Sequence, residues 1–302
     1  MALTPTDWLL AGYIAFLTVV LVVRGPLADG HAWLLVAHGL FVVLLVAVRR
    51  LPPTARVGKA LHAFYPLLLL GGFYSALGIV NGNWGLEAIL RHDAVVQGWE
   101  AAWFGGQPSY DWIRSAPSVF WSGLLHLAYL SYYPMILLPA PLVAWRGDWD
   151  GARRIVFATM LTFVICYGVF VLWPVAGPNY AFPHPTGAVR EVWSARLVYG
   201  LLGAGSSVGA AFPSSHVAAT LATVLVTWRV WRPAGAVLLL PFVLMTVGVV
   251  YCQMHYAVDA AAGLILGPVA AVAAQWLWSW DAGAAAVESP AISLSTPRTS
   301  RR

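Results

Sequence analysis

Residues 155–175 read IVFATMLTFVICYGVFVLWPV, an apolar run without Asp, Glu, Lys or Arg. A helix needs about 20 such residues to cross the hydrocarbon core of a bilayer. The whole chain has this character, because 60% of its 302 residues are hydrophobic and only 10% are charged. Soluble domains carry about 25% charged residues. The sequence therefore predicts an all-α, polytopic membrane protein whose first partner is the lipid bilayer.

Apolar stretches of this kind recur along the chain, all without charged residues except the last, which contains Asp259. They predict a bundle of about eight transmembrane helices, near residues 8–23, 30–48, 61–80, 119–145, 155–175, 211–228, 236–254 and 256–280. We divide the chain accordingly into N-terminal helices (1–80), an extracytoplasmic loop with an interfacial helix (81–118), a transmembrane core (119–280) and a disordered cytoplasmic tail (281–302).

Basic residues predict the orientation of these helices. With the N-terminus inside, the inner segments hold 12 of the 17 Lys and Arg residues: Arg49, Arg50, Arg56, Lys59, Arg146, Arg153, Arg154, Arg229, Arg232, Arg298, Arg301 and Arg302. Short loops rich in Lys and Arg stay cytoplasmic. Both termini are therefore expected in the cytoplasm, and the loops 81–118 and 176–209 outside. This distribution explains the net charge of +5, so no nucleic-acid partner is expected.

The two outer loops differ in composition. Trp99 and Trp103 stand at i and i+4, which predicts an amphipathic helix over Val95–Phe104 on the membrane surface. Asp93 and Glu100 are interpreted as solvated loop acids, with contact to a polar headgroup as the alternative. The loop 176–209 is expected to lack regular structure, because Pro and Gly are dense in it.

Polar residues interrupt the apolar pattern first at residues 209–220, GAAFPSSHVAAT. Pro213 suits the first turn of a helix, and the hydroxyls of Ser214 and Ser215 would lie beside free backbone N–H groups. The N-terminus of a helix binds anions through these groups and through its dipole. His216 would lie beside the bound anion. A capped helix start with a hydrogen-bonded histidine is the alternative.

The second interruption is YCQMHYAVDAAAG at residues 251–263. His255 and Asp259 stand at i and i+4, so on a helix their side chains can touch. A carboxylate bonded to one imidazole nitrogen selects the tautomer and leaves the other nitrogen free as a base or nucleophile. A buried polar pair that braces two helices is the alternative.

The expected topology brings both histidines to the same membrane face. One imidazole can then attack phosphorus while the other protonates the leaving oxygen, which is chemistry suited to phosphoryl transfer. A metal site of His216, His255 and Asp259 is the competing interpretation. No His-Glu-x-x-His or paired-cysteine pattern favours it, so neither a metal nor another cofactor is expected. His126 and Tyr129, one helical turn apart, are interpreted as packed polar groups.

The two motifs resemble those of the type 2 phosphatidic acid phosphatase superfamily of membrane lipid phosphatases and phosphotransferases. Phe-Pro-Ser-Ser-His (212–216) looks like the second signature of that superfamily, and His255-x-x-x-Asp259 like the end of the third. The longer forms, with Asp93–Pro108 and Trp173–Tyr180, resemble the inositol phosphorylceramide synthase-like branch of inositolphosphotransferases.

The resemblance implies a six-helix catalytic core of the lipid phosphatase type and a metal-independent, two-step reaction. His255 would be the nucleophile that forms a phosphohistidine, Asp259 its orienting carboxylate, and His216 the acid that protonates the leaving alcohol. The substrate would be a phospholipid or polyprenyl phosphate, and the acceptor an alcohol in a transferase or water in a phosphatase. The active site would open to the extracytoplasmic face of the cell membrane.

The cationic phosphate ligands of that superfamily are absent from their usual places. The first signature, a Lys followed seven residues later by Arg-Pro, is missing, and Gly248 and Val249 stand where the third often has Ser-Arg. The expected substitutes are the neutral groups of Asn179, Tyr180, Ser214 and Ser215, or Arg190 and Arg196. A transporter with a His–Asp proton relay and a non-catalytic lipid-binding protein are the rival functions.

Overall fold

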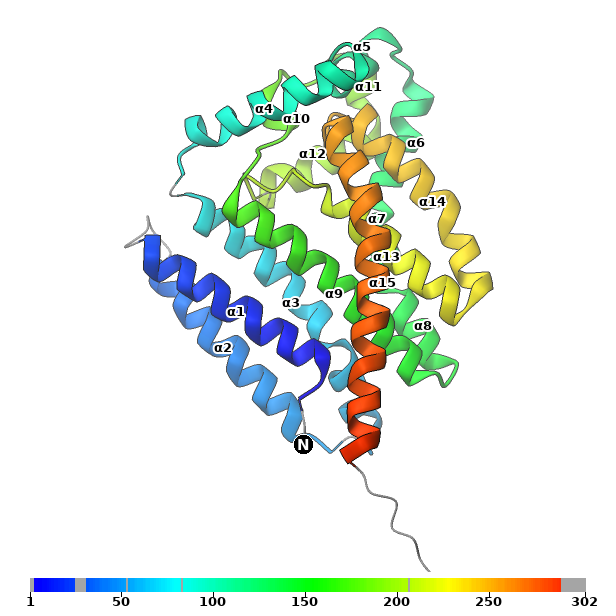
Figure 1. The fold of residues 1–302 in the computed structure, drawn as a ribbon. Helices are drawn as coiled ribbons and strands as arrows, with labels where there is room; N and C mark the ends of the chain where they lie inside the picture. The colour runs from blue at the N-terminus through cyan, green and yellow to red at the C-terminus, as the bar shows by residue number, and fades with distance from the viewer. Residues whose placement is uncertain (1–2, 25–30, 53, 83, 206, 289–302) are drawn as a thin grey trace, which may run out of the picture.

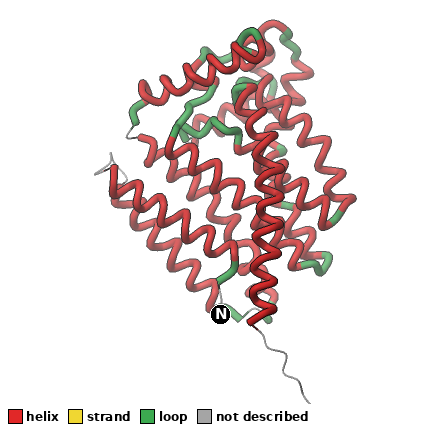
Figure 2. Tube along the Cα trace, in the orientation of Figure 1, coloured by secondary structure: helices red, strands yellow, loops and turns green. Residues whose placement is uncertain are grey.

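The computed structural model describes residues 3–24, 31–52, 54–82, 84–205 and 207–288 (Figure 1). Helices make up most of this part of the chain, and it contains no strand beyond an isolated bridge between Val175 and Ala210 (Figure 2). The prediction of an all-α bundle is confirmed.

Three helices form the N-terminal flank of the bundle: α1 (Pro5–Arg24), α2 (His31–Arg50) and α3 (Arg56–Gly82). They coincide with the first three predicted spans. α3 packs on α9 (Trp149–Leu172), and this contact joins the flank to the rest of the bundle.

Two helices lie across one end of the bundle, α4 (Leu86–Phe104) and α5 (Pro108–Ser115) (Figure 1). A helix is therefore present over 95–104 as predicted, but it begins nine residues earlier. α4 ends at Gly105, whose φ of 74° is the left-handed conformation that glycine adopts at a helix C-cap.

The predicted helix over 119–145 is broken into α6 (Val119–Leu130), α7 (Tyr132–Leu137) and α8 (Pro139–Trp145). The direction changes by 41° between Val119–Leu137 and α8. Proline has no N–H for the helical ladder and its ring collides with the preceding turn, and Pro139 begins α8.

Four helices form the core around the predicted site: α9, α13 (Ser215–Val230), α14 (Arg232–Tyr251) and α15 (Ala257–Glu288). α13 lies among the other three and packs on each of them. Its approach to α15 is close because α15 carries glycine at the contact. A Cβ at Gly263 would lie 2.8 Å from the carbonyl oxygen of Ser214, so only glycine lets the two backbones meet.

The expectation that 176–209 lacks regular structure is wrong. The segment contains two one-turn helices, α10 (Pro178–Ala181) and α11 (Ala188–Glu191), and then the longer α12 (Trp193–Gly205). The last proline of this segment is Pro185. Beyond it, the buried residues Ala195, Val198 and Tyr199 have the spacing of one face of a helix.

Within the described residues, six helices are long and apolar enough to cross a membrane, and the broken segment 119–145 is a seventh if it counts as one span. They are α1, α2, α3, α9, α14 and α15, and they fit an integral membrane protein. α13 has 16 residues, or about 24 Å of helix, so it is shorter than the predicted span 211–228. α15 continues to Glu288, past the predicted start of the tail at 281. The remainder of that tail lies outside the described residues.

Candidate active site

A tight turn between α14 and α15 presents His255. The N–H groups of Met254 and His255 both donate to the carbonyl oxygen of Val249, at 2.9 and 2.8 Å, which folds the turn back on the end of α14. Gln253 has a φ of 61°, the left-handed region that residues other than glycine rarely occupy. Its buried side chain donates to the carbonyls of Pro178 and Pro183 and accepts from Arg114. Such strained positions persist where their surroundings hold them.

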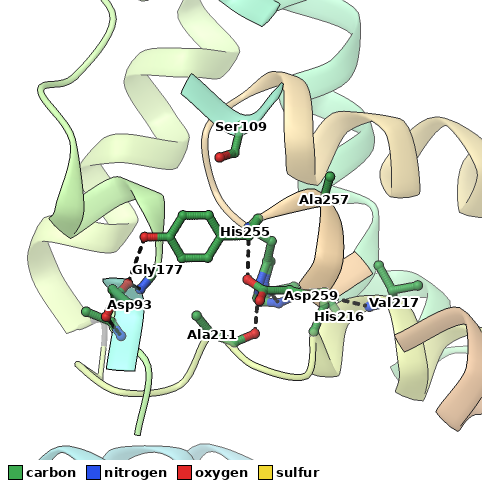
Figure 3. Close-up of polar contacts among 12 residues, drawn as sticks. Asp93, Ser109, Gly177, Ala211, His216, Val217, His255, Ala257 and Asp259 are labelled. Atoms are coloured by element: carbon green, nitrogen blue, oxygen red, sulfur yellow. Dashed lines mark hydrogen bonds and ion pairs between the residues drawn. The ribbon is translucent and has the colours of Figure 1, made fainter. Parts of the chain in front are cut away.

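The hydrogen bonds of His255 determine which nitrogen carries the proton. Nδ1 lies 3.0 Å from the carbonyl oxygen of Ala211 and 3.4 Å from Oδ2 of Asp259 (Figure 3). A carbonyl oxygen can only accept, so Nδ1 carries the hydrogen and Nε2 of the neutral ring keeps its lone pair. Asp259 is fully buried and its Oδ2 also accepts the N–H of Tyr256, at 2.9 Å. His255 lies in the turn before α15, not on the helix as the sequence suggested.

His216 faces the free nitrogen of His255. Its Nδ1 lies 3.2 Å from Nε2 of His255, and the two rings meet edge to face. His216 also stacks on Tyr129 of α6, with ring centroids 4.9 Å apart, and contacts Tyr132 of α7 at 4.3 Å. The expected meeting of the two histidines is therefore present in the structure. Tyr129 is a buried packed residue, as predicted, and it packs on a histidine of the site.

The serines before His216 have different surroundings. Ser214 is the N-cap of α13 and accepts the N–H of Val217 through its hydroxyl oxygen at 3.4 Å. Its own N–H donates to the carbonyl oxygen of Asp259 at 3.0 Å, which ties the two motifs together. Ser215 lies with His216 at the edge of a cavity. Pro213 precedes the N-cap, so the expectation that it occupies the first helical turn is wrong.

Asn179 and Tyr180 belong to the short helix α10. Asn179 is half-buried, and its side-chain Oδ1 is buried without a hydrogen-bond partner in the described part of the chain. The side chain of Tyr180 is 37% exposed. A hydrogen bond joins α10 to the turn that carries His255. The side chain of Gln253, two residues before His255, donates to the carbonyl of Pro178 in α10.

The expectation that Asp93 and Glu100 are solvated acids is wrong, because both are buried on the inner face of α4. Asp93 accepts the N–H groups of Ala176 and Gly177, each at 2.7 Å, and the hydroxyl of Tyr256 at 2.9 Å (Figure 3). Burial raises the pKa of both carboxyls above their ordinary values, and their hydrogen-bond donors oppose that rise.

Glu100 lies beside the start of α15. It accepts the N–H of Ala257 at 2.9 Å and both the N–H and the hydroxyl of Ser109, at 3.3 and 3.0 Å. The spacing of residues in the sequence could have predicted the burial of Asp93 and Glu100. The buried residues of α4 are Ile89, Asp93, Val96 and Glu100, and their spacing of four, three and four places the two acids on the apolar stripe of a helix.

Comparison with known proteins agrees with this geometry. The family model of the PAP2 superfamily matches residues 97–273, which include both motifs and most of the core helices. The chain belongs to the PAP2 superfamily. No curated protein sequence and no solved structure matches it. Membership supports a lipid enzyme of the phosphatase or phosphotransferase type in a membrane.

Three arginines lie in the loops and short helices around this PAP2 site: Arg114, Arg190 and Arg196. Arg114 is engaged with Gln253 and with two backbone carbonyls. Arg190 is half-buried, with its guanidinium carbon 3.2 Å from the ring centroid of Tyr199. The Tyr199 hydroxyl donates to the carbonyl of Cys252 at 3.4 Å, three residues before His255. Arg190 has no carboxylate partner among the described residues. Arg196 is exposed.

A cavity of about 350 Å³ begins at His216 and Ser215. It extends between α3, α7 and α12 and is lined mainly by leucine and tyrosine side chains, among them Leu67, Leu70, Tyr74, Tyr129, Tyr132, Tyr133, Leu201 and Leu202. These surroundings suit an apolar ligand that carries a few polar groups. No group of three or more His, Cys, Asp or Glu side chains in the described segments is arranged to hold a metal ion.

Proposed function

We propose that this protein is a membrane-embedded phosphotransferase that acts on a lipid-linked phosphate headgroup through a phosphohistidine at His255. The observation that carries the proposal is the pairing of His255 with His216. Nε2 of the neutral His255 ring carries the lone pair, and Nδ1 of His216 lies 3.2 Å from it. Such an arrangement places a nucleophile and an acid side by side, where both can reach the same phosphate group.

In the first step, Nε2 of His255 attacks phosphorus and the bond from phosphorus to the lipid or headgroup oxygen breaks. That oxygen leaves as an alcohol with the proton supplied by His216. His255 becomes cationic when its nitrogen bonds to phosphorus, and the carboxylate of Asp259 beside Nδ1 stabilises that charge. The carbonyl of Ala211 keeps the ring oriented throughout.

In the second step, an acceptor hydroxyl attacks phosphorus and the bond to His255 breaks. The proton of the acceptor passes to His216, which is now a base, so the enzyme returns to its starting state. The resemblance of both motifs to inositolphosphotransferases supports a phosphoinositol-type headgroup as the transferred group and an alcohol as the acceptor. His255 is 4% exposed, and such exclusion of water favours an alcohol over hydrolysis. Hydrolysis of a lipid or polyprenyl phosphate is the alternative.

The phosphate oxygens need donors in this dry site. We assign them to the N-terminus of α13 with Ser214 and Ser215, to Asn179 and Tyr180, and to the guanidinium of Arg190. Arg190 supports this assignment because it is half-buried beside Tyr199 without a carboxylate partner in the described chain. The cavity next to His216 would receive the apolar part of the substrate.

The orientation of the site follows from the basic residues. The 12 basic residues counted on the inner segments support cytoplasmic termini, and the site then faces the extracytoplasmic side. Labelling of single cysteines in intact cells, in a background without Cys166 and Cys252, tests this orientation. We expect external reagent to label position 187 and not position 150.

Product analysis tests the reaction. Purified protein in vesicles should convert labelled phospholipids into a new phosphodiester when inositol or another alcohol is added. Release of free phosphate alone would establish the phosphatase alternative. Absence of any turnover on phospholipids and polyprenyl phosphates would reject the enzyme and favour a transporter or a non-catalytic lipid-binding protein.

The role of His216 is tested by the leaving group. General acid catalysis contributes about 10²–10⁴-fold to a rate, so His216→Ala should slow natural substrates by that order. Esters with a weakly basic leaving group, such as nitrophenolate, need little protonation and should lose much less. Equal losses for both classes of ester would contradict the assignment.

A further inference from the structure

We infer that Asp93 and Glu100 of α4 are positioning residues, which hold His255 in place by clamping the three segments that form the site. The inference rests on the proposed function for its kinetic part. Its structural part concerns backbone groups and can be tested without a substrate.

Asp93 joins two of the three segments. One oxygen accepts the N–H of Ala176, and the other accepts both the N–H of Gly177 and the hydroxyl of Tyr256. Hydrogen bonds to an ionised carboxylate are about twice as strong as neutral ones. Asp93 therefore holds the turn before α10 and the residue next to His255 at one point on α4.

Glu100 holds the same region two helical turns further along α4. The N–H of Ala257 has no partner within α15, because it belongs to the first turn of that helix, and Glu100 accepts it at 2.9 Å. A negative charge is favourable at a helix N-terminus. His255 is thus only one residue from the Asp93 contact at Tyr256 and two from the Glu100 contact at Ala257.

The third segment, which contains Ala211, is linked to Asp93 by backbone hydrogen bonds. The N–H of Ala211 donates to the carbonyl oxygen of Val175 at 3.0 Å, and the carbonyl oxygen of Ala211 accepts Nδ1 of His255. Asp93 holds Ala176, the next residue after Val175. The group that selects the tautomer of His255 is therefore linked to Asp93 by two hydrogen bonds and one peptide unit.

Ion pairing does not explain why Asp93 and Glu100 are acidic. No salt bridge to Asp93 or Glu100 occurs among the described residues, and both side chains are buried, at 1% and 0% exposure. A buried charge without a cation costs free energy, and a protein that needed only packing here could use an apolar residue on this stripe. The carboxylates suit the N–H groups of the site segments instead.

The test compares Asp93→Asn and Glu100→Gln with Glu87→Gln, a control on the same helix. Glu87 is exposed and forms an ion pair with Arg91. A misplacement of about 1 Å costs up to 10²-fold in rate, so we expect kcat to fall about 10- to 100-fold in both variants with KM changed much less. Tyr256→Phe removes one of the three bonds to Asp93, together with the bond that its hydroxyl accepts from Gln97, and should give a smaller loss. Glu87→Gln should match the wild type.

Hydrogen exchange measured by mass spectrometry reports directly on the backbone N–H groups that Asp93 and Glu100 bind. Peptides that cover 174–178 should exchange faster in Asp93→Asn, and peptides that cover 253–259 should exchange faster in both variants. Unchanged exchange, or faster exchange with kcat within twofold of the wild type, would overturn the inference. If one variant does not fold, the other and Tyr256→Phe decide. If the wild type turns over no phosphorylated lipid, the proposed function is wrong. The exchange data then still test whether Asp93 and Glu100 hold these segments in place.

Discussion

Two buried acid clusters lie at opposite ends of the bundle and are built differently. At the end where the chain begins (Figure 1), Asp7 is fully buried and paired with Arg49, with an N–O distance of 2.7 Å. Tyr65 also donates to Asp7, and Arg49 donates to Nδ1 of His62 at 2.8 Å. At the other end, the buried acids Asp93, Glu100 and Asp259 have backbone N–H groups, hydroxyls and one histidine as partners, and no Arg or Lys in the described chain.

The difference indicates what each cluster does. An ion pair joins α1 to α2, and hydrogen bonds of Tyr65 and His62 add α3. The ring nitrogens of His62 contact Arg49 and the carbonyl of Leu51. His255 has one nitrogen engaged with acceptors and the other directed at a second histidine. The first cluster pairs its carboxylate with a cation, whereas the second contains the two adjoining histidines on which the proposed function rests.

Replacement of His255 or His62 by alanine should show the largest difference between the two clusters. His255→Ala should abolish turnover, since removal of a catalytic nucleophile costs about 10⁶-fold in a serine protease. His62→Ala leaves Arg49 with one partner fewer and should cost about 1–3 kcal/mol of stability, with turnover per folded protein unchanged. The measurements are turnover and melting temperature in one detergent. A large loss of turnover in His62→Ala would contradict the assignment of function to one end alone.

The acids give the next largest effect. Asp259→Asn preserves shape but favours the wrong tautomer of His255, and a comparable change in a catalytic triad costs about 10⁴-fold. We expect a loss of that order with the protein still folded. Asp7→Asn leaves Arg49 without its carboxylate and should cost about 3–5 kcal/mol of stability with little change in kcat. Near-normal turnover of Asp259→Asn would identify the His255–Asp259 pair as a structural brace.

The smallest effect concerns the pH dependence of stability. Burial raises the pKa of Asp93 in the folded protein, so the folded state binds this proton more tightly than the unfolded chain. The resulting stabilisation is complete below the unfolded pKa and is lost as the pH rises through the folded pKa. The melting temperature of the wild type relative to Asp93→Asn should therefore increase as the pH is lowered from about 7 to about 4.

Two titratable side chains face Asp93, and they define the control. Tyr256 donates to it, and His92 lies next to it and bonds to the carbonyl of Pro174. His92→Gln should leave the pH-dependent difference in place. A difference that decreases as the pH is lowered would contradict the raised pKa of Asp93.

Local patterns in the sequence determined much of this architecture. Runs of apolar residues predicted the helices, because the period of the helix and the thickness of the bilayer both act on neighbouring residues. His255 and Asp259 could be paired from their spacing alone. The two histidine motifs also predicted a common membrane face, because the parity of the intervening helices is countable from the sequence.

Tertiary structure decided how these parts become a site. The carbonyl of Ala211 selects the tautomer of His255, and Asp93 and Glu100 reach backbone N–H groups far from them in the chain. Spacing in the sequence carries no information about such partners, because they depend on how α4 lies across the ends of the core helices. The same packing buries two acids that composition assigns to water, since donors in other segments compensate part of their desolvation.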